Sequence, residues 1–370
     1  MKRLIIILSA ACFIFVLVFI FISPLIAILA KKQLENVFIK SQVSIGRCVF
    51  QPTAGLIFFN IEIKKTGVYD IKVKEASIQY GLKLSLKGPT VYVSIPKKPI
   101  RELAGHIKAG QGAPIFKSVE VSGLALDLHT LDLNAKAGLD LELNLITQSL
   151  DYLNLKMKSF SMFGVELENV LLEFGPGSKD GRFSIPLLKY DLLNVSDIRG
   201  NIKLRDKLLS AYGVSAKALN GAIELDLGLE INKSAGYLAE IKCVNLDIEK
   251  FVRDFNLGEK FDMTGRLSGG LKLKGKACRI EILDGSFSTP PPGGMLVIKD
   301  TKFLENMGRA TNQPVSLLVE SFKNYRYNIG SMSLGFQGGS IVLGIKMEGE
   351  AGKRSFNVIL HDFKLGRGGS

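Results

Sequence analysis

Three carboxylates have the types and spacing that could support acid–base chemistry in this chain. Asp132, Asp140 and Glu142 occupy even-numbered positions of one stretch whose odd-numbered positions are apolar. In a β-strand these side chains would lie on one face, where paired carboxylates can act as general acid and base. A solvated outer strand face produces the same pattern. No GxSxG, P-loop or HExxH motif accompanies them. We therefore predict no catalytic residue and no enzyme.

Histidine and cysteine are too few and too scattered to form a metal site. They are His106, His129, His361, Cys12, Cys48, Cys243 and Cys278. Zinc sites need such residues at short, defined spacings, and the chain contains no CxxC. The sequence predicts no metal, no cofactor and no disulfide framework, and it leaves the redox compartment open. His129 is expected at the surface or in a turn.

Alternation of apolar and polar residues is the dominant pattern of the chain. In Leu131–Leu145 every odd position is Leu or Ala, and every even position is polar, charged or Gly. A period of two places alternate side chains on opposite faces of a strand, so one face is apolar and the other hydrated. Gly138 is expected to mark a bend. The pattern recurs from about residue 60 onward, most clearly in Ala222–Ile231.

Most of the other elements are predicted to be short strands. The predicted strands include Leu56–Ile63, Ile71–Tyr80, Pro89–Ile95, Val165–Phe174, Phe183–Leu187, Ile198–Leu204, Val315–Glu320, Tyr325–Phe336, Ser340–Gly349, Ser355–Asp362 and two short pieces around Gly269-Gly270. Helical spacing predicts short helices at Ile100–Lys108, Asp247–Phe255 and Thr301–Arg309. Residues 31–40 could continue an N-terminal helix with Leu34, Val37 and Phe38 on one face. The helix at Asp247–Phe255 is expected to cap or plug part of the sheet.

An apolar sheet face must be covered by a second sheet, helices, a partner or lipid. Two or three short amphipathic helices are too few to cover so many strands, so the sheet is expected to curl on itself. A tight curl fills its interior with its own side chains, as an ordinary β-core does. A wider curl leaves a trough in which acyl chains gain about 0.8 kcal/mol per buried methylene.

We predict the wider curl. The fold class is then mainly β: an N-terminal transmembrane helix followed by a long curled antiparallel β-sheet that forms a hydrophobic groove. Its candidate lining residues are Leu124, Leu126, Leu128, Leu131, Leu133, Leu139, Leu141, Leu143, Leu145, Ile223, Leu225, Leu227, Leu229, Leu271, Leu273, Leu343 and Ile345.

The N-terminal run Leu4–Ala30 contains 27 uncharged, mostly apolar residues. About 20 suffice for a helix to cross the hydrocarbon core of a bilayer. A cleaved signal peptide would have an apolar region of about 7–15 residues that ends in a small-x-small site. This run is longer, and Ile28 stands where a small residue would precede Ala30. We therefore expect an uncleaved single-pass anchor over residues 1–32, followed by an exported domain.

The formal net charge of +13 is compatible with two interpretations. One is a Lys-rich solvated surface, and the other is attraction to anionic lipid head groups. Nucleic-acid binding is not expected, because the basic residues are scattered through strand-like segments. No basic helix, aromatic RNA-binding motif or zinc-finger spacing accompanies them.

Four C-terminal segments resemble the end of the YdbH-like proteins of the AsmA-like group. They are TGRLSGGLKLKG (264–275), LDGSFSTPPPGG (283–294), SFKNYRYNIGSMSLGF (321–336) and GGSIVLGIKMEG (338–349). The anchor and residues 43–95, with SIGRCVF and ASIQYGLKLSLKGPTVYV, are similar to the start of AsmA-like chains.

The resemblance implies a β-groove that is anchored in the inner membrane, lies in the periplasm and shuttles phospholipid between envelope membranes. It also allows a protein partner in the periplasm or outer membrane. The expected segments are the anchor, an AsmA-like β segment with a short helix (33–112), a central β-groove (113–260) and a YdbH-like β-groove segment (261–370).

Two other function classes stay open. TamB-like proteins and the secretion-system protein GspN are AsmA-like relatives, and they suggest an envelope assembly or secretion-system scaffold whose sheet edge docks protein clients. A hydrolase that uses Asp140 and Glu142 is the third class.

Overall fold

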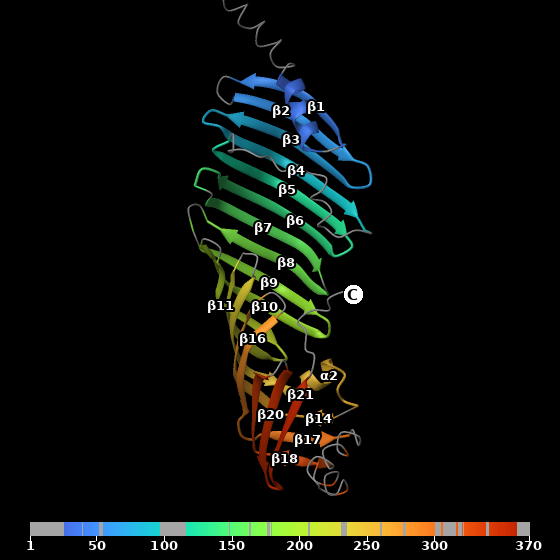
Figure 1. Cartoon of the computed structure of the whole chain (residues 1–370), viewed down its shortest axis with the longest axis vertical. Coiled ribbons are helices and arrows are strands. Elements are labelled where there is room, and N and C mark those ends of the chain that lie inside the picture. Colours follow the sequence, from blue (N-terminus) through green and yellow to red (C-terminus); the bar gives the residue numbers. More distant parts are fainter. Residues whose placement is uncertain are drawn as a thin grey trace, which may run out of the picture. The chain divides into compact units, whose positions relative to one another are not determined.

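The computed structural model of the chain is mainly β (Figure 1). It describes residues 26–38, 40–51, 55–96, 116–147, 149–162, 164–175, 178, 180–205, 208–230, 235–259, 261–276, 279–299, 305, 316, 320, 322–337 and 340–360. Contacts divide the chain into unit 1, Met1–Met162 with Glu168–Ser178, and unit 2, Phe163–Leu167 with Lys179–Ser370. Of the described strands, eighteen are main-sheet strands and three form a small sheet.

Seven strands of unit 1 pair in sequence order. They are β1 (Gln42–Gln51), β2 (Gly55–Lys65), β3 (Tyr69–Gln79), β4 (Lys83–Ile95), β5 (Ser118–Thr130), β6 (Leu133–Asn144) and β7 (Ser149–Met162). β8 (Val165–Phe174) follows them along the chain. All neighbours are antiparallel except β4 and β5, which are parallel. The sheet is therefore mixed, and the prediction of a purely antiparallel sheet is wrong at this pair.

The parallel pair follows from the long connection between its strands. Antiparallel neighbours can be joined by a tight turn, whereas a parallel neighbour requires the chain to return to the end at which the first strand began. The connection between Ile95 and Ser118 is long enough for that return. The predicted helix Ile100–Lys108 falls in this connection and lies outside the described residues.

A helix over residues 26–37 packs on the first strands of unit 1. Its Ile26, Ala30 and Leu34 recur every fourth residue and contact the core cluster that includes Val43, Phe58 and Val93. Phe38, just beyond the helix, joins the same cluster, but Val37 is 36% exposed. The helical prediction is confirmed for residues 31–37, whereas Phe38 and Lys40 are not helical. The grouping of Val37 with Leu34 and Phe38 on one face is wrong.

No described helix is long and apolar enough to span a membrane. The predicted anchor Leu4–Ala30 lies outside the described residues except for residues 26–30, so it stays a prediction.

β-Bulges keep the apolar residues of several strands on one face. In β5 the apolar positions change from odd (Val119, Val121) to even (Leu124, Leu126). The register against β6 shifts between Val121 and Leu124, where Gly123 has a φ of 65°. A bulge adds one residue to a strand and increases its local twist, so the shift keeps both sets on the same face and helps the sheet to curl.

The bulge in β5 has a specific polar partner. The backbone N–H of Gly123 donates to Asp140 Oδ1 at 2.6 Å. Unit 2 repeats the arrangement where Gly213 N donates to Asp226 Oδ1 at 2.8 Å. Asp140 thus stabilises a backbone irregularity. β6 continues through Gly138, where a bend was predicted, and its register against β7 shifts just before that residue, between Lys136 and Ala137.

Asp140→Ala is expected to speed amide exchange at Gly123 about fivefold, because a net hydrogen bond of about 1 kcal/mol is lost. Asp140→Asn keeps an oxygen acceptor and should stay within twofold of the wild type. Hydrogen exchange of the peptide that contains Gly123 measures both variants. Unchanged exchange in Asp140→Ala would show that the carboxylate does not hold the bulge.

Unit 2 continues with a run of antiparallel strands. Its main-sheet strands are β9 (Asp180–Tyr190), β10 (Leu193–Arg205), β11 (Leu208–Ala218), β12 (Gly221–Glu230), β13 (Gly236–Asp247), β15 (Arg266–Lys276), β16 (Arg279–Thr289), β19 (Ile329–Gln337), β20 (Ser340–Gly349) and β21 (Gly352–Leu360). Each pairs with the next in this order. The small sheet contains β14 (Phe261–Met263), β17 (Gly294–Ile298) and β18 (Tyr325–Tyr327). Helix α2 (Ile248–Asp254) confirms the helix predicted at Asp247–Phe255.

Two strand predictions in unit 2 need a change of bounds. The two pieces around Gly269-Gly270 are one strand, β15, because both glycines keep their ladder partners on β13 and β16. The segment Tyr325–Phe336 is two strands in different sheets, β18 and β19. The change of sheet occurs at Asn328, whose N–H donates to Glu348 O at 2.8 Å.

The strand predicted at Val315–Glu320 is wrong at its described residues. Ser316 and Glu320 are helical, as is Phe322 just beyond them. Val315, Leu318, Val319 and Phe322 have i, i+3, i+4, i+7 spacing, which is a helical period. The strand prediction missed this period. The predicted helix Thr301–Arg309 lies outside the described residues except for Glu305, which is helical.

Neither run of strands closes on itself within the described pairings. β1 pairs with β2, and β21 pairs with β20. The sheets in the described part of the chain are therefore open, as the trough prediction requires.

Candidate functional site

The predicted lining residues of unit 1 meet in cross-strand rows on one face. Leu141 lies opposite Val121 on β5 and Leu153 on β7. Leu139 is similarly opposite Leu124 and Leu155. Residues directly opposite each other have side chains on the same face of a sheet. The face formed by Leu124, Leu126, Leu128, Leu133, Leu139, Leu141 and Leu143 with their partners on β7 is called the unit 1 face below.

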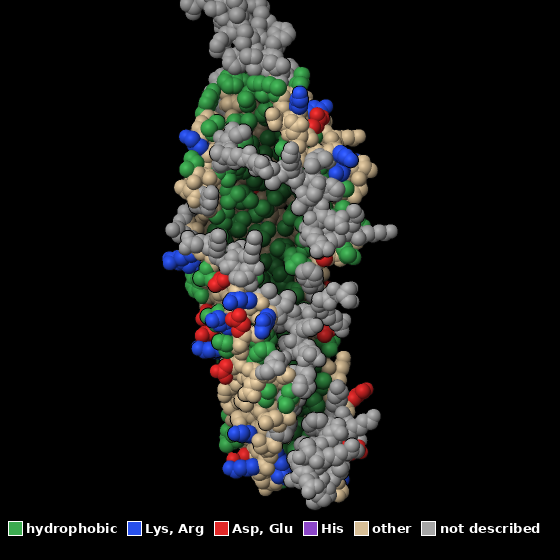
Figure 2. All heavy atoms as spheres, viewed as in Figure 1, with side chains coloured by type: hydrophobic (Ala, Val, Ile, Leu, Met, Phe, Trp, Pro, Cys, Tyr) green, Lys and Arg blue, Asp and Glu red, His purple; other side chains and the backbone are tan. Residues whose placement is uncertain are grey.

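The unit 1 face is only partly covered. None of the described leucines on β5, β6 and β7 is fully buried, whereas Ala135 in the same face is 7% exposed. Figure 2 shows hydrophobic side chains gathered in the hollow of this unit. The packed core of unit 1 instead centres on β1–β4, with Leu128 at its margin. Over β5–β7, apolar area is therefore left for a ligand.

Two predicted lining residues lie in turns. Leu131 precedes β6 and is 66% exposed. Leu145 follows β6, and its N–H donates to Lys117 O at 2.8 Å. Both lie at the ends of the strand and outside the cross-strand rows.

The opposite face of unit 1 carries paired charges. Lys83 Nζ lies 2.8 Å from Glu142 Oε1 and 3.0 Å from Glu120 Oε2. The hydrogen bonds that Lys83 donates to Glu142 and Glu120 raise the pKa of Lys83. Glu142 thus has an ion-pair partner, Asp140 accepts from the bulge, and Asp132 accepts from Thr130 Oγ1 at 2.9 Å. Each of the three carboxylates considered for catalysis has a structural partner.

His129 is the penultimate residue of β5 and lies at the surface, which was one of its two expected places. Its side chain is 38% exposed, and Nε2 lies 2.9 Å from Asp127 Oδ1. The described residues contain no group of three or more His, Cys, Asp and Glu side chains that could hold a metal ion. Cys48 and Cys243 are free thiols, and burial raises the pKa of both.

The predicted residues of unit 2 also share one face. Leu225 lies opposite Val214 and Ile241, and Leu271 lies opposite Ile241 on the other side. The face formed by Ile223, Leu225, Leu227, Leu229, Leu271, Leu273, Leu343 and Ile345 is called the unit 2 face below. Part of it is filled by the protein itself, since Leu271 and Leu273 pack against a core of Ile280, Leu283 and Ile341.

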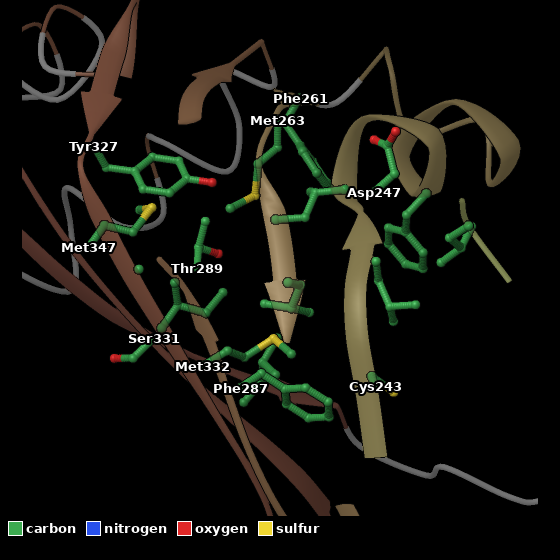
Figure 3. A pocket seen from close by; sticks show the side chains of 18 residues that line it. Cys243, Asp247, Phe261, Met263, Phe287, Thr289, Tyr327, Ser331, Met332 and Met347 are labelled. Carbon is green, nitrogen blue, oxygen red and sulfur yellow. The ribbon is translucent and has the colours of Figure 1, made fainter. Parts of the chain in front are cut away.

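A cavity of about 490 Å³ opens beside the unit 2 face under α2 (Figure 3). It is called the α2 cavity below. Its walls are Cys243, Phe287, Met332, Leu343 and Ile345 of the main sheet. The main sheet also contributes Leu246, Asp247, Leu267, Thr289, Gly330, Ser331 and Met347. The rest of the lining comes from α2 (Ile248, Phe251), the small sheet (Phe261, Met263, Tyr327) and a turn (Leu219). The helix therefore covers part of the sheet face, as the sequence predicted.

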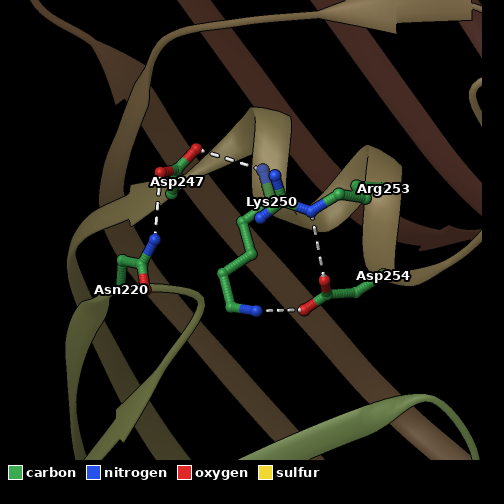
Figure 4. Close-up of polar contacts among 5 residues, drawn as sticks. All are labelled: Asn220, Asp247, Lys250, Arg253 and Asp254. Atoms are coloured by element: carbon green, nitrogen blue, oxygen red, sulfur yellow. Dashed lines mark hydrogen bonds and ion pairs between the residues drawn. The ribbon is translucent and has the colours of Figure 1, made fainter.

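The start of α2 is fixed by Asp247 (Figure 4). Asp247 Oδ1 accepts from Lys250 N at 3.1 Å, as an N-cap residue does. Asn220 Nδ2 donates to Asp247 Oδ2 at 3.3 Å, and Arg266 is 3.6 Å from the same oxygen. Partial burial raises the pKa of Asp247, but the hydrogen bonds from Lys250 and Asn220 and the charge of Arg266 outweigh it and hold this pKa below 3.8.

Asp247→Ala is expected to lower the free energy of local unfolding of α2 by about 1 kcal/mol, the usual effect of losing an N-cap. Because the folded-state pKa of Asp247 is depressed, its stabilisation is complete above the unfolded value of 3.8. It is lost as the pH falls through the folded value. Hydrogen exchange of α2 in the wild type and variant should therefore differ at neutral pH and converge in acid. Asp247→Asn is the control, because it keeps the cap without the titrating charge.

Sequence reasoning missed most of the α2 cavity. Phe261 and Met263 lie in a three-residue strand, and Tyr327 ends another. Elements this short have no measurable periodicity. The one available signal was the helical spacing of Ile248, Phe251, Val252 and Phe255, which predicted a helix able to cover the sheet.

A family model described as "YdbH-like: Intermembrane phospholipid transport protein YdbH" matches residues 96–351. The match covers more than half of the 370 residues and includes all four C-terminal segments that suggested the family. No curated protein and no solved structure gave a significant match. The apolar sheet faces and the family match agree, and the chain belongs to the YdbH-like family of intermembrane phospholipid transport proteins.

Proposed function

We propose that the protein binds phospholipid acyl chains along the unit 1 and unit 2 faces and conducts them between the two membranes of a cell envelope. The N-terminal run Leu4–Ala30 anchors it in the inner membrane, and the rest of the chain lies in the periplasm. No covalent chemistry is required, because the faces only lower the cost of moving an acyl chain through water. Each methylene removed from water contributes about 0.8 kcal/mol.

The partly covered unit 1 face carries this proposal. Its leucines stand in register on three neighbouring strands and are neither fully exposed nor buried in a core. A fully packed β-core would leave less of this apolar surface uncovered, since protein interiors are close-packed. The family match supports phospholipid as the transported molecule, and the uncharged N-terminal run supports the anchor.

Site-specific photocrosslinking tests the proposal with neighbouring pairs of positions. Leu155 and Leu225 belong to the two apolar faces, whereas Lys156 and Glu224 are exposed on the opposite faces. A photoreactive residue at Leu155 or Leu225 should capture phospholipid roughly tenfold more than one at Lys156 or Glu224, because alternate residues of a strand face opposite sides. Equal capture within each pair would contradict the proposal.

The scaffold function makes a different prediction for the same protein. A scaffold that docks clients on a sheet edge would purify in a stable protein complex without bound phospholipid. Mass spectrometry of lipids bound to the purified chain separates the two functions. Phospholipid in the purified protein supports the groove.

A further inference from the structure

We propose that the α2 cavity binds a single alkyl chain whose polar end stays outside. This deepens the proposed function and rests on it for the class of ligand. The unit 2 face would then have two parts. Its open part binds acyl chains along the sheet, and the α2 cavity at its end holds one alkyl chain.

The volume of the cavity fits one chain. At about 490 Å³, it falls in the range of about 300–1,000 Å³ that is typical of small-ligand pockets. Cys243, Phe287, Met332 and Ile345 of its wall belong to one cross-strand row of the unit 2 face, which continues through Gly269. A chain that lies along the face can therefore enter the cavity without leaving an apolar surface.

The polar groups at the cavity wall are already engaged. Tyr327 Oη donates to Thr264 O at 2.6 Å. Burial raises the pKa of Tyr327, while a hydrogen bond with Thr289 opposes this rise. The carboxylate of Asp247 accepts from Lys250 N and Asn220, and the hydroxyl of Ser331 points away from the cavity (Figure 3). A phosphate inside would find no partner, and burying a polar group without one is costly, so an apolar tail is the fitting occupant.

The lining also suits a flexible apolar ligand. Met263, Met332 and Met347 line the cavity, and methionine adapts its shape at low cost. Phe251 of α2 lines the cavity but is 38% exposed. In this proposal the polar end of a bound molecule lies beside α2, where it would meet water.

Photolabelling of the full chain in nanodiscs, with a palmitic acid that carries a mid-chain diazirine, tests the proposal. We expect adducts on the cavity wall, at Met332 or Ile345. Met332→Trp, which fills the cavity, should reduce this labelling at least tenfold. Lys346→Trp, next to Ile345 but exposed on the opposite face, should not reduce it. Leu343→Phe is a milder filling variant, and circular dichroism checks the fold of all three.

Competition with unlabelled chains defines the ligand. Saturated fatty acids of increasing length should compete about fourfold better per methylene until the cavity is full, and then no better. If lysophospholipid of the same chain length competes equally with the labelled fatty acid, the alkyl chain bound in the cavity is that of a phospholipid. If only the unlabelled fatty acid competes, the ligand is a free fatty acid. Both outcomes support a single-chain site. Competition that does not depend on chain length, or wall labelling that Met332→Trp leaves unchanged, would overturn it.

The test of the α2 cavity and the test of phospholipid conduction can fail independently. Phospholipid capture at Leu155 and Leu225 without labelling of the α2 cavity would overturn the single-chain site alone. Labelling of the cavity without phospholipid capture at those two positions would overturn groove conduction alone.

Discussion

Leu141→Asp is expected to reduce phospholipid capture along the unit 1 face by roughly tenfold or more. Leu141 stands in the middle of β6, between Val121 and Leu153. A carboxylate there would have to lose water beside an acyl chain without a cationic partner. That penalty exceeds about 1.4 kcal/mol, which corresponds to a factor of ten in binding. Photocrosslinking from Leu155 in the Leu141→Asp background measures the loss.

Lys156→Asp is the matched control, because it introduces the same carboxylate on the exposed face of the neighbouring strand. It should leave capture from Leu155 within twofold of the wild type. Leu141→Asn, which introduces a polar group without charge, should have an intermediate effect. If Leu141→Asp folds with wild-type circular dichroism and still captures lipid normally, acyl chains do not lie on this face.

Tyr325→Ala is expected to destabilise unit 2 by about 3–5 kcal/mol, the usual cost of truncating a large buried aromatic side chain. Tyr325 is 1% exposed and packs against Phe322 with ring centroids 6.1 Å apart. Its hydroxyl donates to Gly352 O at 2.7 Å and lies 3.2 Å from Met347 O. Removing the ring leaves a cavity and two carbonyl groups without this partner. Denaturant unfolding followed by circular dichroism measures the change.

Two further variants divide this effect into its parts. Tyr325→Phe keeps the ring and loses the hydroxyl, so it should cost about 1–3 kcal/mol. Tyr80→Ala removes a tyrosine that is 63% exposed and should change stability by less than about 0.5 kcal/mol. Equal losses in Tyr80→Ala and Tyr325→Ala would show that Tyr325 is not part of the core that supports the small sheet.

Strand identity was predictable wherever the alternation was long. Ala222–Ile231 was expected as a strand and is β12, Gly221–Glu230. The period of two also placed Leu139, Leu141 and Leu225 on apolar faces, because the pleat alone decides that alternation. The sequence did not predict the short elements, because β14 and β18 have three residues each and no period can be measured over so few.

The pairing of the strands was harder to predict from the sequence than the strands themselves. The parallel pair β4–β5 depends on the path of the connection between Ile95 and Ser118, which no local pattern encodes. The bulges at Gly123 and Gly213 show as a change of parity in the apolar residues, but their partners Asp140 and Asp226 are visible only once the strands are in register. The acidic residues that resembled a catalytic pair therefore have structural roles.

The alternation in the sequence was enough to predict that the chain is mainly β and which residues face the apolar side, because both follow from a local period. Its C-terminal motifs also indicated the family. Tertiary structure alone decided which part of that side is filled. Residues distant in sequence, such as Leu271 and Ile341, close part of the unit 2 face, whereas the leucines of β5–β7 stay partly uncovered. The α2 cavity belongs to the same category, since Cys243, Phe251, Met263 and Ile345 come together only through the packing of a helix and a small sheet on the main one.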